Sequence, residues 1–111
     1  MNDIVEMEDA MDDTRLEPEE LSVALDAREG WALAEDETAI TRDFKFADFR
    51  EAFAFMSECA LAAERLDHHP SWNNVYNRVG VSLTTHSSGG VSARDIEMSK
   101  IMDAAARRYG I

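Results

Sequence analysis

The stretch Asp48–Leu66, DFREAFAFMSECALAAERL, decides how the rest of the chain is interpreted. Asp48 and Glu51 have the spacing of a capping box, which marks the N-terminus of a helix. Behind them apolar residues recur at steps of three and four, which predicts a helix with one face on a core. The residues of this stripe are Phe49, Ala52, Phe53, Met56, Ala60 and Ala63. At about 1.5 Å per residue the helix can cross a small sheet, and Cys59, beside the stripe, is expected to pack rather than react.

Alternation with period two on both sides of this helix predicts strands. Before it, residues 31–33, a polar turn at 35–37 and residues 40–46 predict a β-hairpin. One side of the second strand carries Ile40, Arg42, Phe44 and Phe46. After the helix, one face of a longer run carries Val75, Asn77, Val79, Val81, Leu83 and Thr85. Gly80 bends this run or breaks it into two strands, and both possibilities are open.

Two further helices are indicated at the ends of this pattern. Pro18, followed by two acidic residues, starts a helix over 18–29 that ends at Gly30. Ser92 and Asp95 form a second capping box, and the apolar stripe behind it predicts a helix over 93–108. With hairpins along the chain, the order predicts an α+β two-layer fold: an antiparallel sheet of three to four strands with helices packed on one face. The last helix is the expected site of contact between copies of the chain.

The composition of the 111 residues permits a single domain with a real apolar core. The net charge is −12, and residues 1–20 carry nine of the 23 acidic residues and one of the 11 Lys and Arg residues. Residues 1–15 are therefore expected to be an acidic, disordered arm, and residues 16–111 the domain. The arm is either a solubilising extension, which we favour, or a docking tail for a basic protein partner.

Several classes of protein are disfavoured by the same composition. Neither a membrane-spanning segment nor a secretory signal is expected, because the longest apolar runs are five residues. The single cysteine excludes an intrachain disulfide and a cysteine-built zinc site, and it fits a reducing, cytoplasmic location. Acidity disfavours direct binding of nucleic acid and of anionic membranes.

The three histidines, His68, His69 and His86, fall in loops or at strand ends, where functional groups concentrate. Three interpretations are open from the residues alone. They are turn histidines without a joint role, or metal ligands together with Glu64, which precedes His68 by one helical turn. The metal interpretation lacks any HExxH or His-x-His spacing. The third interpretation is acid–base catalysis by imidazoles that share a pocket.

Three strings of residues narrow this choice. They are Glu64-x-x-x-His68-His69-Pro70-x-Trp72-x-Asn74-Val75-Tyr76-Asn77, then Thr84-Thr85-His86, then Gly90-x-Ser92-x-Arg94-Asp95. With them the sequence resembles the pterin-4a-carbinolamine dehydratase family over about residues 20–111. That family includes the dimerization cofactor of a homeodomain transcription factor.

The resemblance implies a metal-free lyase with no bound organic cofactor. Its reaction is dehydration of 4a-hydroxytetrahydrobiopterin, or a related 4a-hydroxytetrahydropterin, to the quinonoid dihydropterin, which recycles the cofactor of aromatic amino acid hydroxylases. It also implies a homodimer or homotetramer and a pterin as the small-molecule partner. The alternative is a non-catalytic binding module of the same fold, a dimer-stabilising coactivator or an assembly chaperone.

The resemblance also assigns expected roles to single residues. His68 and His86 are the acid–base candidates, and His69 is expected to bind or orient the substrate. Asp95 either orients a histidine or only caps its helix, and Glu64 is expected beside His68. Trp72 either walls the pocket or belongs to the core or an interface. Thr84 and Thr85 are expected to be strand residues rather than catalytic ones.

Overall fold

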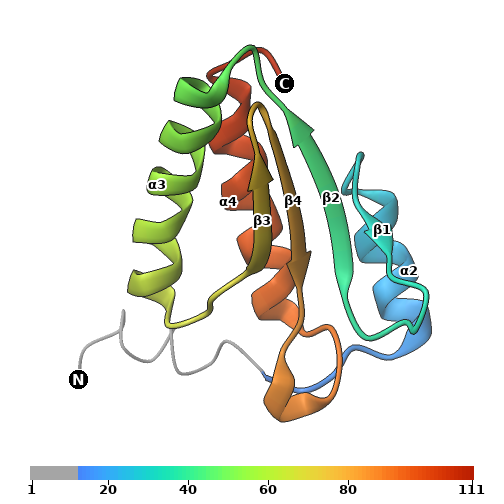
Figure 1. The fold of residues 1–111 in the computed structure, drawn as a ribbon. Helices are drawn as coiled ribbons and strands as arrows, with labels where there is room; N and C mark the ends of the chain where they lie inside the picture. Colours follow the sequence, from blue (N-terminus) through green and yellow to red (C-terminus); the bar gives the residue numbers. More distant parts are fainter. Residues whose placement is uncertain (1–12) are drawn as a thin grey trace.

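Four antiparallel strands form one open sheet, in the order β1-β2-β4-β3 (Figure 1). The computed structural model describes residues 13–111. Along the chain the elements are α2 (Pro18–Asp26), β1 (Ala32–Leu33), β2 (Ile40–Lys45), α3 (Phe49–Leu66), β3 (Ser71–Val75), β4 (Arg78–Leu83), the short 3-10 helix η1 (His86–Ser88) and α4 (Ala93–Arg107). The expected α+β class, with three helices and an antiparallel sheet, is confirmed.

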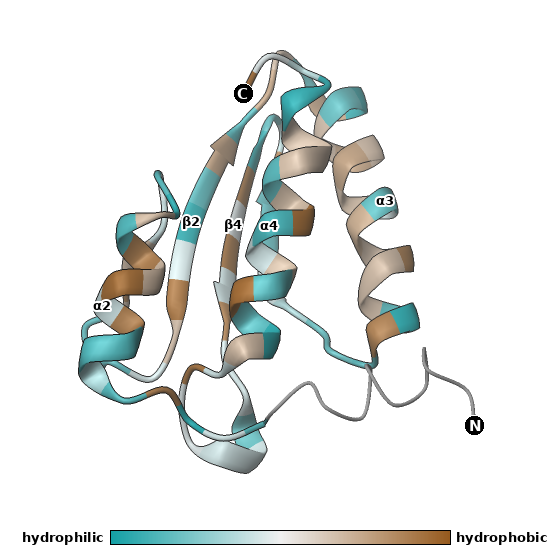
Figure 2. Cartoon of the chain, turned by 180° about the vertical axis from the view of Figure 1, so that it is seen from behind, coloured by the Kyte–Doolittle hydropathy of each residue, from teal (hydrophilic) through white to brown (hydrophobic). Residues whose placement is uncertain are grey.

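The three α-helices cover the same face of the sheet. Seen from behind, α2, α4 and α3 all lie in front of the strands (Figure 2). Helices α3 and α4 begin where the predicted capping boxes place them, but only the box at Ser92 is complete, because the side chain of Glu51 accepts from the N–H of Ala47 and not from that of Asp48. The side chain of Asp48 accepts a hydrogen bond from the backbone N–H of Glu51 at the start of α3. Ser92 and Asp95 cap α4 reciprocally. These caps fix where each helix begins, directly after the strand or loop that precedes it.

The second half of the sheet is a tight hairpin rather than a strand bent at glycine. Val75 pairs with Arg78, so the turn consists of Tyr76 and Asn77, and Tyr76 has a φ of 49°. Gly80 lies inside β4, between Asp43 of β2 and Asn73 of β3. The alternation of residues 74–86 continues through the turn, which is why period two alone did not locate the break.

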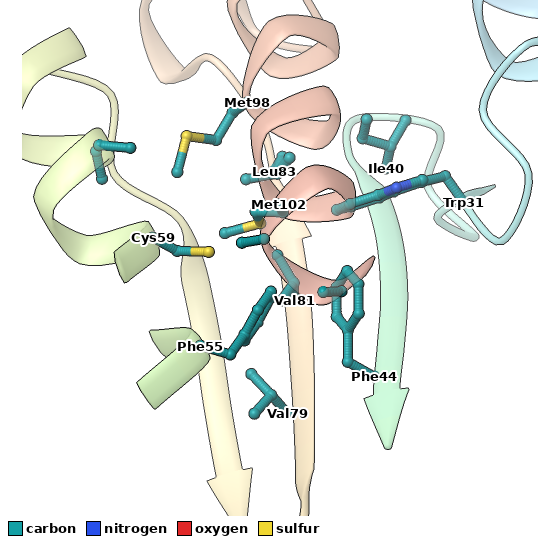
Figure 3. Close-up of a cluster of buried hydrophobic side chains, with 14 of the residues drawn as sticks. Trp31, Ile40, Phe44, Phe55, Cys59, Val79, Val81, Leu83, Met98 and Met102 are labelled. Atoms are coloured by element: carbon teal, nitrogen blue, oxygen red, sulfur yellow. The ribbon is translucent and has the colours of Figure 1, made fainter. Parts of the chain in front are cut away.

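The core lies between the sheet and the helices (Figure 3). Side chains from β4, β2, α3 and α4 converge there, among them Val79, Val81, Leu83, Ile40, Phe44, Phe55, Cys59, Met98 and Met102, and all of these are buried. Trp31 closes the cluster at the β1 end and is also buried. The predicted core face of β2 and β4 is therefore correct.

The predicted core face of α3 is correct in part: Ala52 and Ala63 are buried and Met56 packs against the core. The buried residues of this helix are Ala52, Phe55, Cys59, Ala62 and Ala63. Phe49 and Phe53, which headed the predicted stripe, are 47% and 56% exposed. Their rings pack on one another instead, with centroids 5.6 Å apart. The helix thus has two apolar faces, and only one of them contacts the sheet.

The last helix does not present the apolar surface expected of it. Among the described residues, the large apolar side chains that are exposed belong to α2, α3 and the β3–β4 hairpin: Val23, Phe49, Phe53, Leu61, Val75 and Tyr76. Ile96, Ile101 and Tyr109, at the α4 end of the chain, pack against the core. Within residues 13–111 no helix is long and apolar enough to cross a membrane. Of the expected acidic arm, residues 1–12 lie outside the described part of the chain.

Candidate active site

The three histidines line one pocket of about 520 Å³. His68 and His69 follow the C-terminus of α3, and His86 opens η1 just after β4 ends. The remaining wall comes from the first turn of α4, which contributes Arg94. Two chain segments that are distant in the sequence therefore bring their imidazoles to one cavity, and a third contributes a guanidinium group.

The turn after α3 directs His68 inward. Asp67 has left-handed backbone angles, φ 51° and ψ 45°, and its N–H bonds the carbonyl groups of Ala63 and Glu64. The N–H of His68 also donates to the carbonyl of Ala63, at 3.0 Å. These bonds satisfy the last carbonyl groups of the helix and reverse the chain within one residue. His68 is consequently buried, with 9% of its surface exposed.

His68 is held by a buried carboxylate. Its Nε2 lies 2.5 Å from Oδ1 of Asp95, which is fully buried. The other oxygen of Asp95 accepts from the hydroxyl of Thr85 at 2.8 Å and from the backbone N–H of Ser92 at 2.9 Å. Asp95 thus both caps α4 and contacts His68, so the two roles left open by the sequence are carried by its two oxygens.

His69 has a separate and exposed partner. Its Nε2 lies 2.7 Å from Oε1 of Glu64, and the two side chains are 57% and 78% exposed. The sequence placed Glu64 beside His68; the structure pairs it with His69, because the helix-ending turn rotates His68 toward the core. An exposed pair of this kind contributes little to stability, so its value to a site is in orienting the ring.

The loop that carries His86 is closed by backbone hydrogen bonds. The N–H of Thr85 donates to the carbonyl of Gly90 at 2.9 Å, and the N–H of Gly89 donates to that of His86 at 3.1 Å. The ring of His86 is exposed at the pocket mouth. It is therefore more exposed than His68, which lines the same pocket.

Comparison with known proteins places these residues in a family. The family model described as pterin 4 alpha carbinolamine dehydratase matches residues 14–105. The chain belongs to the pterin-4-alpha-carbinolamine dehydratase family. It is 53% identical over 92 residues to proteins of Brucella ovis and Brucella melitensis named "Putative pterin-4-alpha-carbinolamine dehydratase", covering 83% of this chain and 95% of each relative.

A solved relative has the same fold. The crystal structure of a transcriptional coactivator/pterin dehydratase from Brucella melitensis superposes with a TM-score of 0.82 at 53% identity. The match covers 84% of this chain and 99% of the other. The resemblance noted from the histidine strings is thereby confirmed at the level of family and fold.

Within this dehydratase-family domain, the expected site residues separate into two groups. His68, His69 and His86 line the pocket, and Asp95 supports it from behind. Trp72 does not line this pocket; it lies on β3, half-buried, and packs against the core. Of the two interpretations of Trp72, its placement matches the core.

Several pocket residues were not singled out from the sequence. Thr85 reaches Asp95, although it was expected to be only a strand residue. Arg94 lines the mouth, where its guanidinium contacts the carboxylate of Asp13 and the carbonyl of Leu66. The capping box at Ser92 is the sequence feature that could have indicated a role for Thr85, because its carboxylate, when buried, also accepts from donors of neighbouring residues. Among residues 13–111 no group of three or more His, Cys, Asp or Glu side chains is arranged to hold a metal ion.

Proposed function

We propose that this pocket dehydrates a 4a-hydroxytetrahydropterin to the quinonoid dihydropterin by histidine acid–base catalysis that needs no metal. The observation that carries the proposal is the convergence of His68, His69 and His86 on one cavity, with His68 bound to a buried carboxylate. Family membership supports the substrate class. The product is the form that a reductase would return to aromatic amino acid hydroxylases.

The reaction needs one proton given and one proton taken. An acid protonates the 4a-hydroxyl, the C4a–O bond breaks with its electron pair, and water leaves. A base removes the proton from a ring nitrogen, and that electron pair forms the new ring double bond. Imidazoles exchange protons near neutral pH, so two of them suffice for both transfers. His68 and His86 are assigned these roles, and His69, with Glu64, orients the pterin.

The decisive experiment measures the loss of the 4a-hydroxy adduct in the presence of purified protein. His68→Ala and His86→Ala should each lower kcat by about 10²-fold or more, the usual scale of acid–base catalysis. His69→Ala should act mainly on KM, and Lys45→Ala, at an exposed position remote from the pocket, should leave both unchanged. A wild-type rate no greater than spontaneous dehydration would refute the proposal.

We also infer that copies of the chain associate. Contact with other proteins is the second candidate function of the chain. The exposed Phe49–Phe53 pair on α3 favours it, since solvent-facing aromatic pairs are typical of interaction surfaces. The description of the Brucella relative as a coactivator is consistent with it. Under this alternative, Phe53→Ser would abolish capture of a partner while dehydration continued at the wild-type rate.

A further inference from the structure

Thr85 connects two parts of the candidate active site: the Asp95 carboxylate that holds His68, and the loop that carries His86. It follows the end of β4 and is 5% exposed. Its Oγ1 lies 2.8 Å from Oδ2 of Asp95 and 2.6 Å from the hydroxyl of Ser92, and all three side chains are buried. A buried hydroxyl between two buried polar groups has a limited choice of donor and acceptor roles, and the number of protons determines them.

The donor or acceptor role of each group in this cluster follows from Asp95. Its carboxylate offers only acceptors, and it meets the backbone N–H of Ser92, the hydroxyl of Thr85 and Nε2 of His68. The single hydroxyl proton of Thr85 must therefore go to Asp95. The hydroxyl of Ser92 must in turn donate to Oγ1 of Thr85, which completes a chain of donors that ends on Oδ2.

This order fixes the proton of His68. Because the carboxylate of Asp95 has no proton to donate, it accepts from His68 as well, so Nε2 carries the ring proton. In a neutral imidazole the other nitrogen, Nδ1, then holds the lone pair. The hydrogen bond that one ring nitrogen makes sets which nitrogen carries the proton, so the donors that hold Asp95 in place act on His68 through it.

The backbone of Thr85 supports His86 as well. Its N–H donates to the carbonyl of Gly90 at 2.9 Å, and its carbonyl accepts from the N–H of Ser88 at 3.0 Å. These bonds close the loop over residues 86–89, which carries His86. One residue thus anchors the loop of His86 with its backbone and the partner of His68 with its side chain.

We propose that Thr85 is a positioning residue, whose hydroxyl holds Asp95 so that His68 keeps its proton on Nε2 and presents Nδ1 as the lone-pair nitrogen. The proposal deepens the dehydratase assignment and rests on it for the catalytic consequence. The tautomer itself is a property of the free protein. It can therefore be measured whether or not the dehydration assay succeeds.

The first test compares Thr85→Val with Thr85→Ser and with Thr38→Val. Valine keeps the shape of threonine and removes the hydroxyl, whereas serine restores it. Thr38 is the control, because its hydroxyl donates to the carboxylate of Asp36 and neither residue lines the pocket. We expect Thr85→Val to lower kcat by about 10- to 100-fold, the factor that corresponds to one hydrogen bond to a charged group. KM should change by less than about twofold, and Thr85→Ser should recover most of the rate.

The second test reads the histidine directly. Long-range ¹H–¹⁵N spectra of the wild type, assigned with His69→Ala and His86→Ala, should show His68 protonated on Nε2. In Thr85→Val the same spectra should show a mixture of tautomers, and in Thr38→Val they should match the wild type. A wild-type His68 protonated on Nδ1, a Thr85→Val spectrum identical to the wild type, or an equal loss of kcat in Thr38→Val would each overturn the proposal.

Discussion

Asp103 binds three side chains at one end of the core. Its Oδ1 accepts from Nε1 of Trp31 at 2.9 Å and from Nη1 of Arg42 at 2.8 Å, and its Oδ2 lies 3.4 Å from Nη1 of Arg28. Asp103 is 8% exposed, and it joins α4 to β2 and to the segments on either side of Gly30. Two largely buried guanidinium groups thus share one carboxylate.

Removing this charge should destabilise the fold. We expect Asp103→Asn to lower the free energy of unfolding by about 2–3 kcal/mol, because both guanidinium groups lose their counter-charge while they stay largely buried. Urea unfolding measures the effect. The control is Glu58→Gln, which breaks the exposed pair with Arg108 and should cost no more than about 0.5 kcal/mol. Equal losses in the two variants would contradict the argument.

Cys59 should make stability fall at high pH. Burial raises the pKa of its thiol to about 12, from an ordinary value of 9.0. The folded protein therefore keeps a proton that the unfolded chain loses above about pH 9, so the unfolded state gains stability as the pH rises from there toward 12. The urea midpoint of the wild type should decline more steeply between about pH 8 and pH 11 than that of Cys59→Ala. Parallel declines would show that the thiol ionises equally in the folded and unfolded states, which would contradict the raised pKa.

At the residue scale, the sequence predicted which side chains belong to the site better than it predicted their hydrogen-bond partners. Asp95 was expected to cap a helix or orient a histidine, and its two oxygens do both. Glu64 was assigned to the wrong histidine, since the assignment assumed that the helical direction continues through His68. The left-handed turn at Asp67 redirects that side chain, and no periodicity reports a single residue with positive φ.

Among the elements, the end of α3 is the one that positions the site. Asp67 adopts φ 51°, a region that costs most residues about 1–2 kcal/mol and costs glycine nothing. We expect Asp67→Val to lower the free energy of unfolding by about 1–2 kcal/mol and to lower kcat, because His68 follows directly. Asp67→Gly should keep wild-type stability and rate. Chemical denaturation and the dehydration assay on both variants measure this. If Asp67→Val behaves like Asp67→Gly, the turn does not position His68.

The elements themselves were largely predictable because their signals are local. The N-cap at Asp48, the capping box at Ser92 and the hairpin before α3 appear where the sequence placed them. The core face of α3 was not predictable in the same way. Phe49 and Phe53 form an apolar stripe as regular as the buried one, and only the position of the sheet decides which stripe is covered.

At the scale of the whole molecule, the pocket could not be derived from patterns along the chain. It forms where α3, β4 and α4 meet, and this meeting depends on the strand order β1-β2-β4-β3. Period and capping predict each element but not its neighbours. Only the joint resemblance of the three strings indicated that His68 and His86, which lie on different elements, would share a cavity.

The exposed face of α3 leads to a prediction about assembly. Phe49 and Phe53 are about half exposed, and burying one phenylalanine is worth about 1.5–3 kcal/mol. In a twofold interface each copy contributes the same patch, so a charge at Phe53 is felt twice. In light-scattering chromatography we expect the wild type to elute with a mass at least twice that of the 12.5 kDa chain. Phe53→Glu should raise the dissociation constant by about 100-fold or more.

The matched control for this experiment is Val23→Glu. Val23 is 71% exposed, but it lies on α2, on a different element from the Phe49–Phe53 pair. A charge there changes the net charge of the chain as Phe53→Glu does, so general repulsion between acidic chains would weaken both variants equally. A contact through α3 would weaken only Phe53→Glu. A wild type that is monomeric at about 100 µM would contradict the prediction that copies of the chain associate through α3.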